Sequence, residues 1–340
     1  MSLQPPLAVV AIGGNSLMRD NQHQSLADEQ EAVHETARHI AEMVAQGWHV
    51  VVTHGNGPQV GQQLLRAELA RHVIPEIPPL DIAVAETQGS IGYIIQRALN
   101  NEFHRRGLAK QAVTLITQTL VDASDPAMHT PSKPIGLFYT AEEARQKQRE
   151  YGWSMLEDAG RGWRRVVASP NPQRIIEQQA IEMLARTGFV VIATGGGGIP
   201  VTIDNDGMLN GLEAVIDKDL ASSHLASSLR ADLLLISTGV EQVALHYHTP
   251  QQRNLGRLTF SEARRYLDEG QFARGSMEPK IRAVLEFLER GGRAALITMP
   301  EAMIRALKRE TGTWILPDGQ PWPELALDSS LKNSSIHGTI

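Results

Sequence analysis

The stretch that decides the fold lies near the start of the chain and reads LAVVAIGGN, residues 7–15. Its first six residues are all apolar, which predicts a strand buried on both faces, as in a parallel sheet. Two glycines follow directly, at the point where such a strand has to turn towards a helix. The same order of apolar run and glycines returns in HVVVTHGNGPQVG, residues 49–61, and in FVVIATGGGGIP, residues 189–200. Three distant parts of the chain therefore predict the same strand-and-turn unit.

Short apolar runs alternate with longer segments whose apolar residues are spaced three and four apart. Such runs are typical of strands and such segments of helices, so the alternation indicates βαβ units. It predicts an α/β fold with a mainly parallel sheet covered by helices. The expected strands are residues 7–12, 50–53, 113–116, 189–193, 233–236 and 294–298, and the expected helices are residues 32–45, 82–106, 175–187, 219–229 and 279–290.

Two stretches interrupt this alternation. Residues 122–170 contain four prolines and the basic run GRGWRR, and we expect them to form an inserted subdomain. Residues 202–216 contain the sequence DNDG, which predicts the turn of a hairpin. Beyond residue 316, prolines and then serines accumulate, which indicates a docked or flexible extension rather than a further domain.

Composition narrows the possible functions. The 340 residues carry a formal net charge of −6 and only 5% aromatic residues, so we expect neither nucleic acid nor a membrane as a partner. With no cysteine, disulfides, thiolate zinc sites and cysteine nucleophiles are excluded. No window approaches 18 uninterrupted apolar residues, and the first residues lack the features of a signal peptide. We therefore expect a cytoplasmic protein.

The position of the glycine clusters points to phosphate. Each cluster follows a predicted parallel strand, and ligands of open α/β sheets bind beyond the carboxyl ends of the strands. Glycine allows backbone N–H groups to approach an anion closely. The alternative is that these glycines only make tight turns. The chain contains no Gly-Lys pair and hence no Walker A motif, and no cluster fits G-x-G-x-x-G, which disfavours a dinucleotide-binding dehydrogenase.

Several longer strings are unusual enough to compare with known families: TQGSIGY (87–93), KPIG (133–136), EDAGRGWRR (157–165), AVIDKD (214–219) and GSMEPK (275–280). With AIGGNSL (11–17), HGNGPQVG (54–61) and the glycines from 195 onward, they follow one another between about residues 7 and 316. In this order they resemble the carbamate kinases of the amino-acid kinase family.

The resemblance implies a three-layer α/β/α sandwich with a mainly parallel central sheet and a small protruding subdomain. It implies an N-terminal lobe (1–188) for carbamate or carbamoyl phosphate, including the inserted subdomain at about 122–170. A C-terminal lobe (189–316) would bind ATP or ADP with Mg²⁺, and residues 317–340 would form an extension. The implied reaction is ATP + carbamate = ADP + carbamoyl phosphate, running towards ATP in fermentative catabolism of arginine, agmatine or purines, in a homodimer.

The resemblance also implies roles for individual residues. Those implied to be catalytic are Lys133, Lys218, Asp219 and Lys280. Those implied to bind the acceptor are Gly13, Gly14, Asn15, Gly55, Asn56 and Gly57. Those implied to bind the nucleotide are Gly196, Gly197, Asp217, Lys218, Thr238, Gly239, Val240, Tyr247, Met277 and Lys280. No protein side chain is implied as a metal ligand, because Mg²⁺ would arrive with the nucleotide.

Some interpretations stay open at this point. Asp219 begins a predicted helix, where an acid is favoured for structural reasons alone. Glu86 stands where the family usually has an apolar residue, and Glu278 places an acid beside Lys280 in the GSMEPK motif. Two other functions remain possible: a kinase for another small carboxylate, such as an N-acylated acidic amino acid, or a catalytically silent nucleotide-binding partner of a transcarbamoylase.

Overall fold

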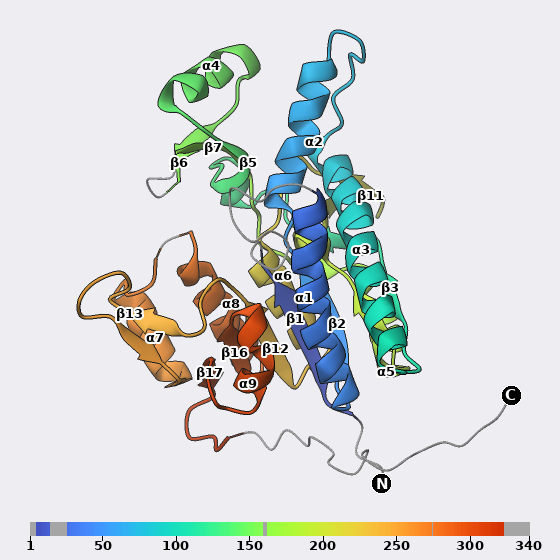
Figure 1. The fold of residues 1–340 in the computed structure, drawn as a ribbon. Helices are drawn as coiled ribbons and strands as arrows, with labels where there is room; N and C mark the ends of the chain where they lie inside the picture. Colours follow the sequence, from blue (N-terminus) through green and yellow to red (C-terminus); the bar gives the residue numbers. More distant parts are fainter. Residues whose placement is uncertain (1–4, 14–25, 159–161, 274, 323–340) are drawn as a thin grey trace, which may run out of the picture.

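A computed structural model of the chain describes residues 5–13, 26–158, 162–273 and 275–322 (Figure 1). Its centre is an eight-stranded sheet in the order β15-β17-β16-β12-β1-β2-β9-β3. The six strands from β16 to β3 are parallel to one another, and β17 and β15 run the opposite way at one edge. The strands are β1 (Leu7–Ile12), β2 (His49–His54), β3 (Ala112–Thr114), β9 (Val190–Ile192), β12 (Leu233–Ser237), β15 (Arg257–Thr259), β16 (Ala295–Thr298) and β17 (Thr313–Leu316).

Strand β1 shows why the fold has three layers. Its side chains alternate between two hydrophobic cores, with Leu7, Val9 and Ala11 in one. Ala8, Val10 and Ile12 lie in the other. The first core packs against α5 (Gln178–Arg186), α6 (Lys218–Ser228), α7 (Phe260–Asp268) and α8 (Met277–Glu289), and the second against α1 (Leu26–Ala45), α3 (Leu80–Arg105) and α9 (Met303–Leu307). The predicted α/β/α sandwich with a mainly parallel sheet is confirmed.

Smaller sheets surround the ends of the central strands. One has the order β11-β10-β4-β8 and another pairs β13 with β14. The predicted hairpin is present between β10 and β11, where Gly207 adopts a φ of +80° and the N–H of Met208 donates to Asp204 Oδ1 at 2.9 Å. These strands are β4 (Gln118–Leu120), β8 (Arg174–Ile175), β10 (Ile199–Ile203), β11 (Leu209–Gly211), β13 (Val243–Leu245) and β14 (Arg253–Leu255).

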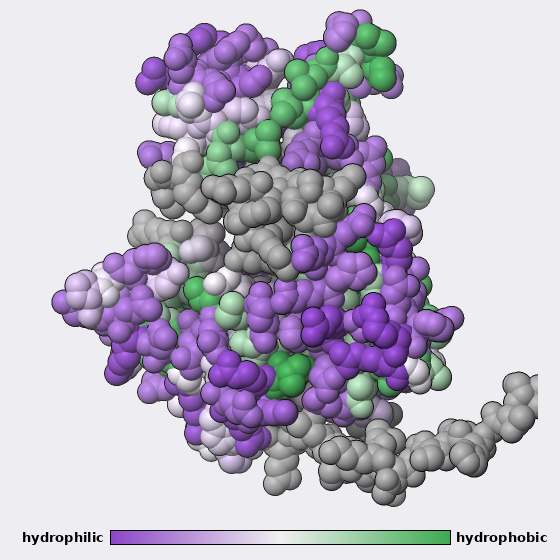
Figure 2. All heavy atoms as spheres, viewed as in Figure 1, coloured by the Kyte–Doolittle hydropathy of each residue, from purple (hydrophilic) through white to green (hydrophobic). Residues whose placement is uncertain are grey.

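A small unit protrudes above the sheet, at the upper left of Figure 1, and its surface in this view is mainly hydrophilic (Figure 2). It consists of β5 (Lys133–Tyr139), α4 (Ala141–Tyr151), β6 (Met155–Glu157) and β7 (Trp163–Val167), with the strands in the order β5-β7-β6. Its base rests on α2 (Gly57–Ala70), because a Cβ added at Gly61 would lie only 2.0 Å from the Cα of Gly136. Two glycines thus allow β5 to sit directly on helix α2.

The end of the described chain is docked onto the main body. The ring of Trp322 lies edge-on to the buried Trp314, with ring centroids 5.9 Å apart. The guanidinium groups of Arg257 and Arg309 lie 5.1 and 4.9 Å from the centroid of the Trp322 ring. Within the described part of the chain, no helix combines the length and apolar character needed to cross a membrane.

Candidate active site

The start of helix α6 carries an unusual concentration of charge. Asp217 caps the helix, since its Oδ1 accepts hydrogen bonds from the N–H groups of Asp219 at 2.8 Å and Leu220 at 3.2 Å. Acidic residues are favoured here because they satisfy free N–H groups and face the positive end of the helix dipole. The local sequence therefore explains why an aspartate stands at 217. It does not explain the three lysines that gather around it.

These three lysines come from three different elements. Lys218 is on α6 itself and its Nζ lies 2.8 Å from Asp219 Oδ1. Lys280, on the first turn of α8, places its Nζ 3.2 Å from the other oxygen of Asp219. Lys133, at the start of β5, forms an ion pair with Asp217. The structure thus brings together all four residues predicted to be catalytic.

Burial gives these charges their strength. The Asp219 side chain is only 6% exposed, and Lys218 and Lys280 are 12% and 16% exposed. Burial alone would raise the pKa of Asp219, but the two lysines outweigh it and hold that pKa below its usual range. Burial lowers the pKa of Lys218, against the attraction of Asp219. Three ammonium groups facing two carboxylates leave an excess of positive charge, which suits an anionic ligand.

The predicted acceptor glycines lie next to this cluster. A Cβ at Gly55 would be 3.9 Å from Cδ of Lys218, so the loop after β2 runs beside that side chain. Asn56 is buried and its Nδ2 donates to Thr87 Oγ1 at 2.9 Å. Gly57 begins α2, and its added Cβ would lie 3.6 Å from the carbonyl oxygen of Pro134 in β5. Gly14 and Asn15 lie outside the described residues.

The glycine run after β9 serves close packing. It contains the short 3-10 helix η3 (Gly195–Gly197). A Cβ at Gly196 would lie 2.1 Å from Asn56 Nδ2, and one at Gly197 would lie 2.6 Å from the carbonyl oxygen of Ile216. Both glycines have positive φ, and so does the buried Thr194 just before them. Gly196 and Gly197 therefore join the loop after β2 to the segment that leads into Asp217.

His54 supports the same loop from beneath. It is fully buried at the end of β2, where a Cβ at Gly195 would lie 2.3 Å from its Nε2. Burial lowers the pKa of His54 to about 4, so its ring is neutral at pH 7. A neutral, enclosed ring adds no charge to the lysine cluster and fills space below the glycines.

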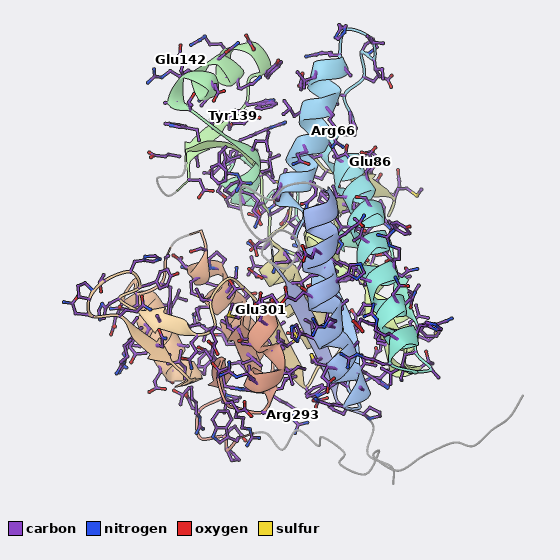
Figure 3. The ribbon with its side chains drawn as sticks, in the orientation of Figure 1. Arg66, Glu86, Tyr139, Glu142, Arg293 and Glu301 are labelled. Atoms are coloured by element: carbon purple, nitrogen blue, oxygen red, sulfur yellow. The ribbon has the colours of Figure 1, made fainter. Side chains whose placement is uncertain are left out.

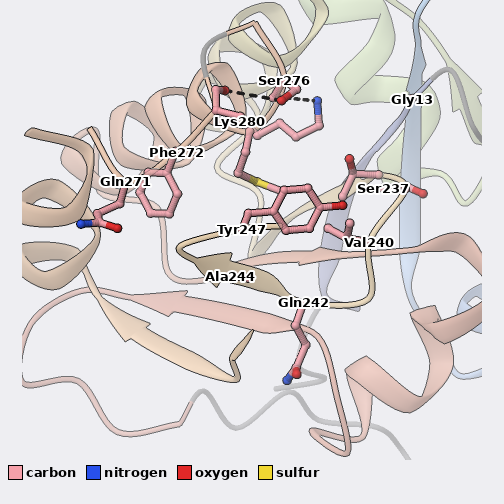
Figure 4. Close-up of a pocket in the computed structure, with 14 residues that line it drawn as sticks. Gly13, Ser237, Val240, Gln242, Ala244, Tyr247, Gln271, Phe272, Ser276 and Lys280 are labelled. Atoms are coloured by element: carbon pink, nitrogen blue, oxygen red, sulfur yellow. Dashed lines mark hydrogen bonds between the residues drawn. The ribbon is translucent and has the colours of Figure 1, made fainter. Parts of the chain in front are cut away.

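A cavity of about 430 Å³ opens beside the cluster (Figure 4). This is the size range of small-molecule sites. Lys280 contributes to both the cavity and the cluster, and its Nζ also donates to the carbonyl oxygen of Ser276 at 3.3 Å. Of the predicted residues, the cavity is lined by Gly13, Thr238, Gly239, Val240, Tyr247, Met277 and Lys280. Gly196, Gly197, Asp217 and Lys218 do not line it.

Four cavity residues were not singled out from the sequence: Gln242, Gln271, Phe272 and Ala273. Gln242 directly precedes β13, and the other three precede the GSMEPK motif. The sequence gives one weak indication that Phe272 belongs to the site, because it is a large apolar residue shortly before the glycine-containing GSMEPK motif. Its burial, with 4% exposure, appears only once α7 and α8 are packed together.

The two departures from the family pattern both lie on the surfaces of helices. Glu278 faces along α8, where Arg282 Nη2 lies 2.8 Å from its carboxylate. Glu86 is exposed near the upper end of α3 in Figure 3. In the described part of the chain, no group of three or more His, Asp and Glu side chains is arranged to hold a metal ion.

Comparison with known proteins agrees with this architecture. The amino acid kinase family model matches residues 6–299 of the chain. The chain therefore belongs to the amino acid kinase family.

Several relatives at high identity are carbamate kinases or carbamate kinase-like proteins. The carbamate kinase-like protein YahI of Escherichia coli is 51% identical over 313 residues, covering 91% of this chain and 98% of that protein. A carbamate kinase of Pyrococcus furiosus is 48% identical over 311 residues, covering 91% and 98%. The solved structure of a Giardia lamblia carbamate kinase bound to citric acid superposes with a TM-score of 0.88 at 39% identity, covering 92% and 99%. These relatives indicate that the protein is a kinase, an enzyme of the phosphotransferase class.

Proposed function

We propose that the protein is a carbamate kinase, catalysing ATP + carbamate = ADP + carbamoyl phosphate. The observation that carries the proposal is the convergence of Lys133, Lys218 and Lys280 on two aspartates beside a cavity of nucleotide size. The high identity to carbamate kinases supports the choice of acceptor. A Giardia carbamate kinase, 39% identical with a TM-score of 0.84, has been solved bound to AMP-PNP, which supports ATP as the nucleotide.

The chemistry explains why lysines suit this reaction. A carboxylate oxygen of carbamate attacks the γ-phosphorus of ATP, a new P–O bond forms, and the bond to the β-γ bridging oxygen breaks, releasing ADP. Carbamate is already ionised, so no proton has to be removed. Catalysis then consists of holding two anions in place and stabilising charge on the transferred phosphoryl group. Both aspartates already face lysines, which fits a role in orienting those lysines rather than in taking protons.

The proposed division of roles follows from position. Residues 189–316, together with Gly13 after β1, would hold the nucleotide in the cavity, with its base towards Tyr247 and Met277 and its phosphates towards Lys280. Residues 1–188 would hold the acceptor, through the glycine turns after β1 and β2 and through Lys133 of the inserted subdomain. Lys218 would lie between the two substrates, oriented by Asp219.

The donor set fits a Mg²⁺ ion carried by the nucleotide. Asp217 and Asp219 are each paired with a lysine. The Mg²⁺ ion would therefore be bound by phosphate oxygens of ATP or ADP and not directly by these carboxylates. When bound, the ion would neutralise phosphate charge. The chain's own residues would bind and orient those phosphates through Lys218 and Lys280.

Three further features belong to the proposal. The reaction would run towards ATP in the cell, because carbamoyl phosphate is a mixed anhydride and a strong phosphoryl donor, as in the catabolism of arginine, agmatine or purines. The protein would work in the cytoplasm. It would form a homodimer, a proposal supported by exposed apolar side chains near α3: Ile82, Met208 and Leu209 are 46%, 64% and 42% exposed. Light scattering on the purified protein measures the mass of the assembly and so tests whether it is a dimer.

The test of the reaction is ATP formation by purified protein supplied with carbamoyl phosphate, ADP and Mg²⁺. We expect ATP to appear in proportion to enzyme and to be lost when either carbamoyl phosphate or ADP is omitted. A folded sample that makes no ATP would contradict the proposal. Phosphorylation of an N-acylated acidic amino acid in its place would assign another acceptor, and ADP binding without turnover would assign a silent nucleotide-binding protein.

A further inference from the structure

Asp217 uses its two carboxylate oxygens for different partners. Oδ1 accepts the N–H groups of Asp219 and Leu220 at the start of α6. Oδ2 accepts a hydrogen bond from Lys133 Nζ, which reaches it from β5, 84 residues earlier in the chain. One side chain therefore joins the protruding unit to the helix that carries Lys218 and Asp219.

The backbone around Lys133 is fixed by contacts within the protruding unit. Ser132 N–H donates to the carbonyl of Val167 at 3.1 Å, and Pro134 favours an extended conformation for the residue before it. Further along β5, Arg164 Nη2 donates to the carbonyl of Gly136 at 3.1 Å. The long Lys133 side chain, 28% exposed, is the part that needs a partner to fix it.

We propose that Asp217 is a positioning residue that holds the Lys133 ammonium against the first turn of α6, and that it is not a contact of the nucleotide. The expectation from the sequence was a nucleotide-binding role. The observations that favour positioning are that both oxygens of Asp217 are engaged within the protein and that Asp217 does not line the cavity. The inference about catalysis rests on the proposed function, whereas the ion pair itself does not.

The charges around Lys133 give the inference a measurable signature. Burial disfavours its charged form, but attraction by Asp217 and Asp219 outweighs that effect and raises the pKa of Lys133, against an opposing contribution from Arg164. Replacing Asp217 by a neutral residue removes the larger attraction, so the pKa of Lys133 falls. The alkaline decline of kcat/KM for carbamoyl phosphate should then begin at a lower pH than in the wild type. Because Asp217 also raises the pKa of Lys218, the shift is assigned to Lys133 only if it is absent in a Lys133→Met background.

The test uses Asp217→Asn in the full chain, because asparagine caps helices about as well as aspartate and keeps the start of α6 intact. We expect kcat/KM for carbamoyl phosphate to fall on the order of 10²-fold, as for a misplaced reacting group. The Kd for ADP should change less than about twofold. The control is Asp232→Asn, since Asp232 also accepts a backbone N–H, from Leu7 at 2.9 Å, and pairs with a cation, Arg293, at 2.6 Å, at the other end of the strands. It should leave both values unchanged.

A double-mutant cycle with Lys133→Met separates positioning from capping. If Asp217 acts through Lys133, then Asp217→Asn adds little to the loss already caused by Lys133→Met; independent, multiplying losses contradict the proposal. A tenfold weaker ADP affinity with unchanged kcat would also overturn it and restore the nucleotide role. The same cycle measured by urea unfolding tests the pair even if the wild type forms no ATP: non-additive stabilities support the pairing, and additive ones overturn it.

Discussion

The start of α6 and the neighbouring cavity share Lys280 but are built on opposite physical principles. At the start of α6, five charged side chains are held by specific ion pairs with little access to water. In the cavity, apolar side chains such as Val240 and Phe272 and uncharged polar ones such as Gln242 form a wall defined mainly by shape. The first region is tuned by charge and the second by volume.

This difference has a consequence for how each region tolerates change. Removing one charge from a buried cluster leaves its partners uncompensated, which is costly both for folding and for catalysis. Removing part of the cavity wall reduces the binding free energy of the ligand roughly in proportion to the contact area lost, and it leaves the chemical step intact. Variants in the two regions should therefore fall into two classes, separated by whether kcat or KM changes.

The largest effect is expected for Asp219→Ala. It leaves Lys218 and Lys280 facing each other without their shared carboxylate, so we expect a loss of about 3–5 kcal/mol in the free energy of unfolding. ATP formation should fall by about 10³-fold or more in the fraction that remains folded. Urea unfolding and initial rates measure the two effects.

The stability effect of Asp219 also has a predicted pH dependence. Its pKa is lowered in the folded state, so its contribution is fully present above the ordinary value of 3.8 and fades as the pH falls below it. Wild type and variant should differ most near neutral pH and converge in acid. Asp206→Ala, in the exposed turn of the β10–β11 hairpin, is the control and should stay within about 0.5 kcal/mol at every pH. An equal loss in both variants would show that the buried cluster is not special.

The next largest effects should divide between two lysines. Lys133→Ala should lower kcat by about 10²–10³-fold while leaving ADP binding nearly intact, because Lys133 faces Asp217 and does not line the cavity. Lys280→Ala should in addition weaken ADP, because its side chain lines the cavity. Calorimetric titration with ADP, alongside initial rates, checks both. If both variants lost only nucleotide affinity, the proposed separation of the two regions would be wrong.

Sequence reasoning succeeded where one local property determines the structure. Residues 7–12 and 233–236 are continuous apolar runs, and only a strand between two helical layers buries both of their faces. The same reasoning failed at residue 175, expected in a helix. Ile175 instead belongs to β8 and pairs with Thr119 of β4, and α5 begins only at Gln178. The reversed strand β17 was also not expected, since it is only four residues long, begins with Thr313 and follows a stretch without clear periodicity.

The candidate site was predicted unevenly for a related reason. Lys133, Lys218 and Lys280 stand in unusual strings, so their importance could be inferred, but their meeting around two aspartates depends on packing between β5, α6 and α8. The cavity wall was harder, because Gln242 and Phe272 come from irregular segments without a periodic pattern. Their common location exists only in the folded chain.

A smaller effect is expected for Tyr247→Ala, which tests the shape-defined region. Tyr247 lines the cavity and is 47% exposed, so its removal should cost little stability. We expect KM for ADP to rise by roughly tenfold, corresponding to about 1.4 kcal/mol of lost contact, with kcat unchanged. Tyr93, a tyrosine on α3 that is 57% exposed, provides the control: Tyr93→Ala should leave KM for ADP as in the wild type. A large fall in kcat for Tyr247→Ala would mean that the cavity takes part in the chemical step.

The smallest effect is expected for Glu278→Gln, next to the boundary between the two regions. Proximity in sequence to Lys280 raised the question of whether this acid alters the affinity for the nucleotide. In the folded chain its carboxylate instead accepts hydrogen bonds from Arg282 at 3.1 and 2.8 Å along the surface of α8. An exposed pair of this kind contributes about 0–1 kcal/mol to stability. Because Arg282 offsets the negative charge of Glu278, this carboxylate has little electrostatic effect on a ligand in the cavity. KM for ADP should therefore change less than about twofold, and its salt dependence should stay the same. A clearly tighter nucleotide in the variant would show that Glu278 acts on Lys280 through space, and that surface charge reaches the buried cluster.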